Sequence, residues 1–310
     1  MNLTPLGSTG LHVTDVSFGT APLGQLFGPV PLPDAITAVH AAIDLGITLF
    51  DTSPYYGDAE ERLGIALEGR RDDVLISTKT GRFPGDEFDF SPARIRESLE
   101  NSLRLLRTDH VDVLFLHDID FVDVDDILAE SIGAAQQLKA EGKCRAVGTS
   151  GYGLAAAARV IAESDVDVVL NFAHGTLLDD SMRDTLGPLA RQHDVGLLNA
   201  AAVALGALTP AVLTREDDTF MAPPAVLASA REMAAECRRR GVDIAFLANQ
   251  YAIQRIGTAT TVIGTTRLPH LHSAVEASTT PIDEELLAAV LTHQPDPATH
   301  QWDVGRPENR

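Results

Sequence analysis

The stretch "ITLFDTSPYYG" at residues 47–57 runs from an apolar segment into a carboxylate, a proline, two phenols and a glycine. Similar runs rich in Val, Ile and Leu recur, and most are followed by a stretch of helical length. They are "DVSFGT" at 15–20, "ITLFD" at 47–51, "DVLISTK" at 73–79, "VDVLFLH" at 111–117, "CRAVGTS" at 144–150, "VDVVLN" at 166–171, "VGLLN" at 195–199 and "TTVIG" at 260–264. Apolar strands alternating with helices indicate a parallel sheet covered on both faces. These eight units predict a (β/α)₈ TIM barrel.

No stretch rich in Gly, Ser or Pro divides the chain, so residues 1–310 are expected to form a single domain. A doubly wound sheet in two domains is the alternative architecture. The segment "LTPLGSTGLHVT" at 3–14 has a turn signal at its centre and predicts an N-terminal β-hairpin that closes the bottom of the barrel. Extra helices and loops are expected at the C-terminal end.

The charge and the cysteines limit the class of protein. With 44 acidic and 24 basic residues, the formal net charge is −20, which repels nucleic acids and anionic membrane surfaces. Cys144 and Cys237 have neither disulfide-framework nor zinc-site spacing, which fits a cytoplasmic location without a bound metal. The N-terminus predicts no signal peptide. We expect a monomer or small homo-oligomer that acts on a small molecule, with neither nucleic acid nor membrane as a partner.

One apolar stretch, residues 196–213, is long enough for a membrane span. Asn199, Gly206, Thr209 and Pro210 interrupt it, so a buried strand that runs into a loop is predicted instead.

Polar side chains stand at the ends of the apolar runs. Because the carboxyl ends of barrel strands converge on one face, residues far apart in the sequence are expected to meet there. The residues at these ends are Asp51, Lys79, His117, Ser150, Asn171, Asn199 and Gly264. Each by itself could simply cap a strand. Together with Tyr56, however, Asp51, Lys79 and His117 supply the groups needed for proton-transfer catalysis.

A phenol has a pKa of about 10, and a nearby ammonium is expected to lower it, which makes Tyr56 with Lys79 a candidate acid/base pair. Asp51 would hold the charge on Lys79, and His117 would bond a substrate oxygen. These groups carry no electrons, so a redox reaction requires a bound cofactor.

At these residues the chain resembles the aldo-keto reductases along nearly its whole length. The sequence motifs that carry the resemblance are "FDTSPYYG", "ISTK", "SPARIRESLENSLRLLRTDHVDV" leading into "LFLH", and "GKCRAVGTS". The resemblance implies a (β/α)₈ barrel that uses NAD or NADP, with Tyr56 as general acid/base, Lys79 and Asp51 adjusting its pKa, and His117 orienting the substrate oxygen.

The same resemblance implies a cofactor site. Its expected residues are Gly19, Thr20, Asp51, Ser150, Asn171, Asn199, Ala200, Leu205, Gly264, Thr265, Thr266, Arg267 and His270. Ser150 and Asn171 match positions that hold the nicotinamide carboxamide, and the loop from Gly264 precedes a helix N-terminus suited to phosphate.

The chain also departs from the family pattern in the cofactor site. Gly151 replaces an Asn, and Ala200 stands where an aromatic residue often stacks. In the loop after the eighth run, Gly264 and His270 replace basic residues, and Ser273-Ala274 replaces an acidic-Asn pair. These changes favour NAD slightly over NADP, although Arg267 could reach a 2′-phosphate.

A narrower likeness, in "FDTSPYYG", "EFDFSPARIRESLENSL" and "LHDIDF", is to the L-galactose dehydrogenase and L-fucose (D-threo-aldose 1-) dehydrogenase branch. It implies oxidation of the anomeric carbon of an aldose of L-galactose, L-fucose or D-arabinose type to a lactone. Asp118 and His174 would then contact sugar hydroxyls, unless Asp118 caps a helix and His174 is a structural wall residue.

Three alternatives to an aldose dehydrogenase remain. They are an NADPH-dependent aldehyde or ketone reductase of broad specificity, a Schiff-base lyase or aldolase barrel using Lys79, and a non-catalytic cofactor-binding subunit. The segment 206–224 and the tail 295–310, which contains Trp302, are candidates for covering the pocket.

Overall fold

The computed structural model describes residues 1–213, 222–299 and 304–310, and its centre is a closed parallel barrel. The barrel strands are β3 (Val16–Gly19), β4 (Leu49–Asp51), β5 (Leu75–Thr80), β8 (Val111–His117), β9 (Cys144–Gly151), β10 (Val168–Phe172), β11 (Gly196–Ala200) and β12 (Thr260–Gly264). Each pairs in parallel with the next along the chain, and β12 closes the ring on β3. All eight predicted runs are therefore barrel strands.

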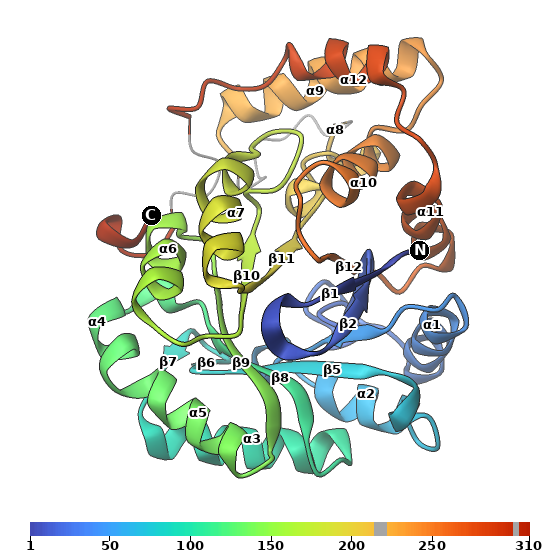
Figure 1. Ribbon diagram of the computed structural model, residues 1–310. Helices are drawn as coiled ribbons and strands as arrows, with labels where there is room; N and C mark the ends of the chain where they lie inside the picture. The colour runs from blue at the N-terminus through green and yellow to red at the C-terminus, as the bar shows by residue number, and fades with distance from the viewer. Residues whose placement is uncertain (214–221, 300–303) are drawn as a thin grey trace.

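Helices surround the barrel (Figure 1). The longer ones are α1 (Leu32–Asp44), α2 (Ala59–Ala66), α3 (Pro92–Leu106), α5 (Ile132–Ala140), α6 (Leu154–Glu163), α7 (Ser181–His193), α9 (Pro224–Arg239), α10 (Ile244–Gln254), α11 (Leu268–Thr279) and α12 (Glu284–Leu291). The α3 helix shows how sequence sets such an element. Ser91 caps it by accepting a hydrogen bond from the Arg94 backbone, proline occupies the first turn, and Ile95 and Leu99 are buried against the barrel.

The N-terminal hairpin is formed by β1 (Leu3–Pro5) and β2 (His12–Thr14), which pair antiparallel. In Figure 1 it crosses the centre of the ring of strands. Its buried residues Leu6, Leu11 and Val13 pack with Leu49 and Phe115 of the barrel strands in one apolar cluster. The hairpin therefore closes one end of the barrel, as predicted, and leaves the carboxyl ends of the strands for the site.

A second hairpin, β6 (Arg82–Phe83) with β7 (Glu87–Phe88), follows β5 directly and was not predicted. Its turn contains Pro84-Gly85, a turn signal that the sequence does carry. The hairpin brings the side chain of Arg82 beside the end of β8.

The C-terminal region adds α9 and α12, which lie together at the outer edge in Figure 1, and a short 3₁₀ turn, η7 (Pro307–Asn309). Asn309 in that turn donates from Nδ2 to the backbone oxygens of Asp120 and Val122, at 3.0 and 2.8 Å. Residues 214–221 and Trp302, from the two segments expected to cover the pocket, lie outside the described residues. None of the helices described is long and apolar enough to cross a membrane.

Candidate active site

The parallel strands of the barrel bring their polar ends to the same end of the barrel. Gly19 pairs with Asp51, and His117 pairs with Ser150. Asn171 is level with Asn199 on β11. Side chains from most of the sequence therefore meet at the carboxyl end of the barrel, because neighbouring parallel strands end together there.

At the centre lies a buried ion pair between Asp51 and Lys79. The Lys79 Nζ atom donates to both Asp51 carboxylate oxygens at 2.6 Å and to the Thr52 backbone oxygen at 2.9 Å. Ser77 donates to Asp51 Oδ1 at 2.8 Å. Lys79 and Asp51 are 1% and 3% exposed, so their mutual pairing and these added hydrogen bonds are what offset the cost of burying two charges.

Tyr56 and His117 face this pair. The Lys79 ammonium lies 5.0 Å from the centre of the Tyr56 ring, and the Tyr56 and His117 rings meet edge to face at 5.9 Å. The His117 Nδ1 atom is 3.1 Å from the Ser53 hydroxyl. The structure thus brings together the four residues that the sequence singled out for proton transfer.

Burial raises the pKa of Tyr56 well above its usual value, and the carboxylates of Asp51 and Asp118 raise it further. The net shift is therefore upward, opposite to the lowered pKa expected for a phenol beside Lys79. The physical reason is that the charge of Lys79 is matched by Asp51, while the phenol is withdrawn from water. Tyr56 is held as a protonated phenol at neutral pH.

Burial, together with the charges of Lys79 and Arg82, lowers the pKa of His117 well below its usual value. A neutral imidazole has one N–H donor and one acceptor nitrogen. His117 can therefore make directional hydrogen bonds here without carrying a charge.

A charged cluster missed by the sequence reasoning lies beside His117. The Arg82 guanidinium forms ion pairs with Asp118 and Asp86 and donates to the Tyr55 hydroxyl at 3.0 Å. Burial raises the pKa of Asp118, and Arg82 opposes that rise. Asp118 makes no side-chain cap to the turn that follows it, so the helix-cap alternative for this residue is wrong.

Aromatic rings line the same side of the barrel mouth. Phe88 and Phe121 stack with ring centres 5.3 Å apart, and Tyr152 meets Phe121 and Phe172 edge to face. Such faces suit the apolar C–H surfaces of a ligand, while Asp118 and Arg82 suit its polar groups.

The barrel strands and the residues just after them also hold buried polar atoms without partners among the described residues. They are Thr20 Oγ1, Thr52 Oγ1, Thr80 Oγ1, Ser150 Oγ, Asn171 Oδ1 and Asn199 Oδ1. Buried polar groups normally form hydrogen bonds. The amide of Asn171 is already oriented, because its Nδ2 donates to the backbone oxygens of Gly151 and Tyr152. Its free oxygen and the free Ser150 hydroxyl fit the needs of a carboxamide.

The N-terminus of α11 follows β12, and no side chain caps it. Thr265 accepts a hydrogen bond from the Arg267 backbone at 3.0 Å, while Gly264, Arg267 and His270 are exposed. Free N–H groups at a helix N-terminus attract phosphate. Gly19 lies against Gly264 and Val262, where an added Cβ would be 3.3 and 3.1 Å from them.

Two further expected cofactor residues are Ala200, the last residue of β11, and Leu205 in the loop that follows. Ala200 is buried at the strand end. Ala201, Ala204 and Leu205 have positive φ angles of 63°, 49° and 52°, a left-handed conformation that is rare for residues other than glycine.

His174 lies apart from the proton-transfer group. Its Nδ1 atom is 2.8 Å from Asp179 Oδ2 and 3.4 Å from the Ser181 hydroxyl. It lines a groove of about 690 Å³ between α6, α7 and the C-terminal tail. Tyr152, whose ring meets Phe121 and Phe172, lines the same groove, and the contact of His174 with a sugar hydroxyl stays a prediction.

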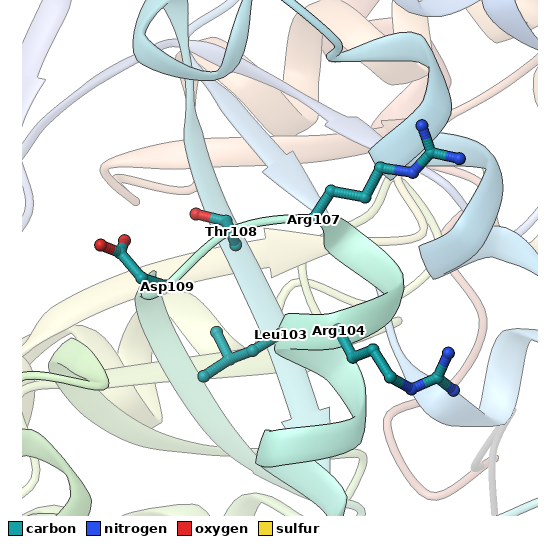
Figure 2. A pocket seen from close by; sticks show the side chains of 5 residues that line it. All are labelled: Leu103, Arg104, Arg107, Thr108 and Asp109. Atoms are coloured by element: carbon teal, nitrogen blue, oxygen red, sulfur yellow. The ribbon is translucent and has the colours of Figure 1, made fainter.

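A shallow hollow of about 560 Å³ lies at the end of α3, lined by Leu103, Arg104, Arg107, Thr108 and Asp109 (Figure 2). It precedes β8, and so lies at the opposite end of that strand from His117. It contains none of the predicted site residues. Within the described ranges, no group of three or more His, Cys, Asp or Glu side chains could hold a metal ion.

Comparisons with known proteins agree with this geometry. Residues 15–294 match the model of the Aldo/keto reductase family. L-galactose dehydrogenase of Arabidopsis thaliana is 37% identical over 302 residues, which cover 94% of this chain and 93% of that protein. D-threo-aldose 1-dehydrogenase of a Pseudomonas species is 28% identical over 297 residues, covering 87% and 90%.

Among solved structures, the holo form of aldo-keto reductase AKR11C1 from Bacillus halodurans has a TM-score of 0.80 at 25% identity and covers 98% of each chain. The family match spans most of the chain and the fold agrees with it. The chain therefore belongs to the aldo/keto reductase family and is an NAD(P)-dependent oxidoreductase.

Proposed function

We propose that this enzyme oxidises the anomeric carbon of a free aldose to a lactone, with NAD preferred over NADP. The observation that carries the proposal is the convergence of Tyr56, His117 and the Lys79–Asp51 pair at the ends of three barrel strands. The similarity to L-galactose dehydrogenase and D-threo-aldose 1-dehydrogenase supports an aldose as the substrate.

Tyr56 is the group that takes the proton from the anomeric hydroxyl, and in reverse it protonates the carbonyl oxygen. Because burial raises the pKa of Tyr56, its phenol stays protonated at neutral pH and can supply the proton that reduction needs. As a base it must first lose its own, and the ammonium of Lys79 stabilises the phenolate that results. Asp51 pairs with Lys79 through both carboxylate oxygens and fixes its position.

His117 positions the reacting oxygen. Ser53 Oγ accepts a hydrogen bond from the Tyr55 backbone and lies 3.1 Å from His117 Nδ1. If the Ser53 hydroxyl donates to Nδ1, the ring proton is on Nε2. That nitrogen can then donate to the substrate oxygen without the imidazole being charged.

The bound nicotinamide would supply the hydride acceptor that the protein side chains lack. Ser150 and Asn171 would hold its carboxamide through their free buried oxygens. The threonines Thr265 and Thr266 and the uncapped start of α11 would hold the phosphate next to the adenosine. We assign Gly19, Thr20, Asn199, Ala200, Leu205 and His270 to the same site.

A substrate panel tests the function. L-galactose, L-fucose, D-arabinose and simple aldehydes would be assayed with NAD and NADP in parallel, following the absorbance of the reduced nicotinamide. We expect oxidation of at least one aldose with the higher kcat/KM for NAD. Reduction of simple aldehydes with NADPH, and no aldose oxidation, would instead identify a broad-specificity reductase.

A Schiff-base mechanism is disfavoured by the geometry of Lys79. Its ammonium donates three hydrogen bonds, to Asp51 and Thr52, whereas a nucleophilic amine needs a free electron pair. Borohydride trapping of a covalent substrate adduct on Lys79 would contradict the proposed mechanism.

A further inference from the structure

The β6–β7 hairpin brings Arg82 to the barrel mouth and encloses it. The Arg82 side chain is 13% exposed. Its guanidinium lies 4.0 Å from the centre of the Tyr55 ring, 5.5 Å from that of Phe88 and 5.3 Å from that of Phe121. Arg82 is therefore held between aromatic rings from three different loops.

The guanidinium of Arg82 joins two carboxylates with very different surroundings. Asp86, on the hairpin turn, is 65% exposed, whereas Asp118 is 8% exposed. The Tyr55 hydroxyl accepts from Arg82 and donates to Asp86 at 3.3 Å. Because these contacts fix the planar guanidinium, Arg82 can hold the Asp118 carboxylate in one orientation.

Asp118 is placed for a ligand. It follows His117 directly, and its backbone takes the left-handed conformation, with φ of 57°. Asp118 Oδ2 lies 3.6 Å from His117 Nε2, which is the nitrogen assigned to the reacting oxygen. A buried carboxylate is costly unless it is paired, and Arg82 supplies that pairing, because the Asp118 side chain forms no helix cap.

We propose that Arg82 determines the preference of this enzyme for hydroxylated substrates, because it positions Asp118 to accept a hydrogen bond from a hydroxyl beside the reacting carbon. This inference rests on the proposed function, since it takes Tyr56 and His117 as the site of reaction. Asp118 contacts the substrate, and Arg82 acts through Asp118 as a positioning residue.

The test compares two aldehydes that differ in their hydroxyl groups. Glyceraldehyde and propanal would be reduced with the same cofactor at the same pH, and the measured quantity is the ratio of their kcat/KM values. Any effect of a substitution on Tyr56 or on the cofactor acts on both substrates and cancels in the ratio. L-galactose oxidation would be measured alongside.

For Arg82→Met we expect the glyceraldehyde/propanal ratio to fall about 10- to 100-fold, mostly through a higher KM for glyceraldehyde, because a hydrogen bond to a charged group is lost. Arg82→Lys keeps the positive charge but lacks the planar guanidinium. Its glyceraldehyde/propanal ratio should therefore lie between the ratios of Arg82→Met and the wild type.

Arg94→Met is the matched control. Arg94 packs on the ring of Phe83, the neighbour of Arg82 on β6, at 4.1 Å. Successive residues of a strand point to opposite faces, so this substitution disturbs the same hairpin from its other side. We expect the Arg94→Met ratio to equal that of the wild type.

An unchanged ratio in folded Arg82→Met would overturn the inference. If that variant fails to fold, as judged by circular dichroism, an unchanged ratio in Arg82→Lys does the same. A wild type that prefers glyceraldehyde but oxidises no aldose would instead contradict the proposed function and leave the role of Arg82 supported.

Discussion

Tyr56 shows how burial and charge compete at a single residue. A cation, Lys79, lies beneath its ring, yet its phenol is harder to ionise than a phenol in water. Asp51 largely neutralises the charge of Lys79, and burial destabilises the charged phenolate relative to the neutral phenol. Tyr56 therefore stays protonated at neutral pH, and forming the phenolate that oxidation needs is the harder requirement.

Tyr56→Phe removes the proposed proton carrier and little else. We expect kcat to fall by about 10³-fold in both directions, the range found for removal of a general acid or base. Tyr251→Phe is the matched control, because the Tyr251 hydroxyl donates to Asp180, the residue before α7, at 2.5 Å. It should cost about 1 kcal/mol of stability and leave turnover unchanged. Near-normal turnover in folded Tyr56→Phe would contradict the assignment.

The pH dependence should differ between the two directions. The pKa of Tyr56 is raised and that of His117 is lowered, so neither group changes its charge near neutral pH. Reduction, which needs the protonated phenol, should be nearly independent of pH from about 6 to 9. Oxidation needs the phenolate, so its kcat/KM should rise with pH across the same range. A plateau of the oxidation rate below pH 8 would show that the Tyr56 pKa is not raised.

At the scale of elements, two connecting loops hold the site in shape. The loop after β3 passes so close to the turn that carries Tyr56 that a Cβ on Gly24 would lie 1.5 Å from the Tyr56 backbone oxygen. The loop after β8 forms the turn η4 (Ile119–Phe121), and the C-terminal tail packs on it.

Gly24→Ala should displace the turn that carries Tyr56, because neither backbone has room for the methyl group. A shift of about 1 Å at a reacting group can cost about 100-fold in rate, so we expect kcat/KM to fall by about that factor. Gly133→Ala is the control. Gly133 is in α5, has open space around it, and should gain about 0.5–1 kcal/mol from the change. Wild-type activity in Gly24→Ala would show that the two loops are not coupled.

Asp120, on η4, should make stability depend on pH. Burial and the nearby Asp118 charge raise the pKa of Asp120 to about 7, whereas an unfolded Asp titrates near pH 3.9. Between about pH 4 and 7 the folded state therefore holds a proton that the unfolded state has lost, and stability falls as pH rises. The loss is complete above pH 7 and absent below pH 4.

Asp120→Asn removes this titration. We expect the variant to gain up to about 4 kcal/mol relative to the wild type on going from pH 4 to pH 8, measured by urea unfolding. Asp126→Asn, an exposed position on the same segment, is the control and should follow the wild type. An identical pH dependence in Asp120→Asn and the wild type would contradict the raised pKa.

At the scale of the whole molecule, the proposed cofactor would contact the ends of several strands and so stabilise the barrel as a unit. A ligand at 100 times its Kd adds about 2.7 kcal/mol to the unfolding free energy. We expect NAD to raise the Tm by several degrees, and NADP to raise it less at equal concentration.

Arg267→Ala should remove the Tm shift caused by NADP and keep the shift caused by NAD. Arg255→Ala, which breaks an exposed pair with Glu284, is the control. An equal or larger shift with NADP would contradict the NAD preference.

Much of the fold could be predicted from local patterns. Val113 to Leu116 is a continuous apolar run followed by the polar His117, and "SPAR" at 91–94 marks the start of a helix. Such signals depend on residues only a few positions apart, which is why the strands and the N-terminal hairpin were found. The β6–β7 hairpin was missed because each of its strands has only two residues, too short for an alternating pattern.

The sequence by itself determined the barrel and the family, because strand patterns and motifs are local, and it singled out Asp51, Tyr56, Lys79 and His117 as candidates for proton transfer. Only the tertiary structure decided the direction of the Tyr56 pKa and the pairing of Arg82 with Asp118. It also decided the contact of Asn309 with Asp120, across 189 positions of sequence. Burial and Coulomb energy depend on distances between segments that are remote along the chain, and closure of the barrel sets those distances.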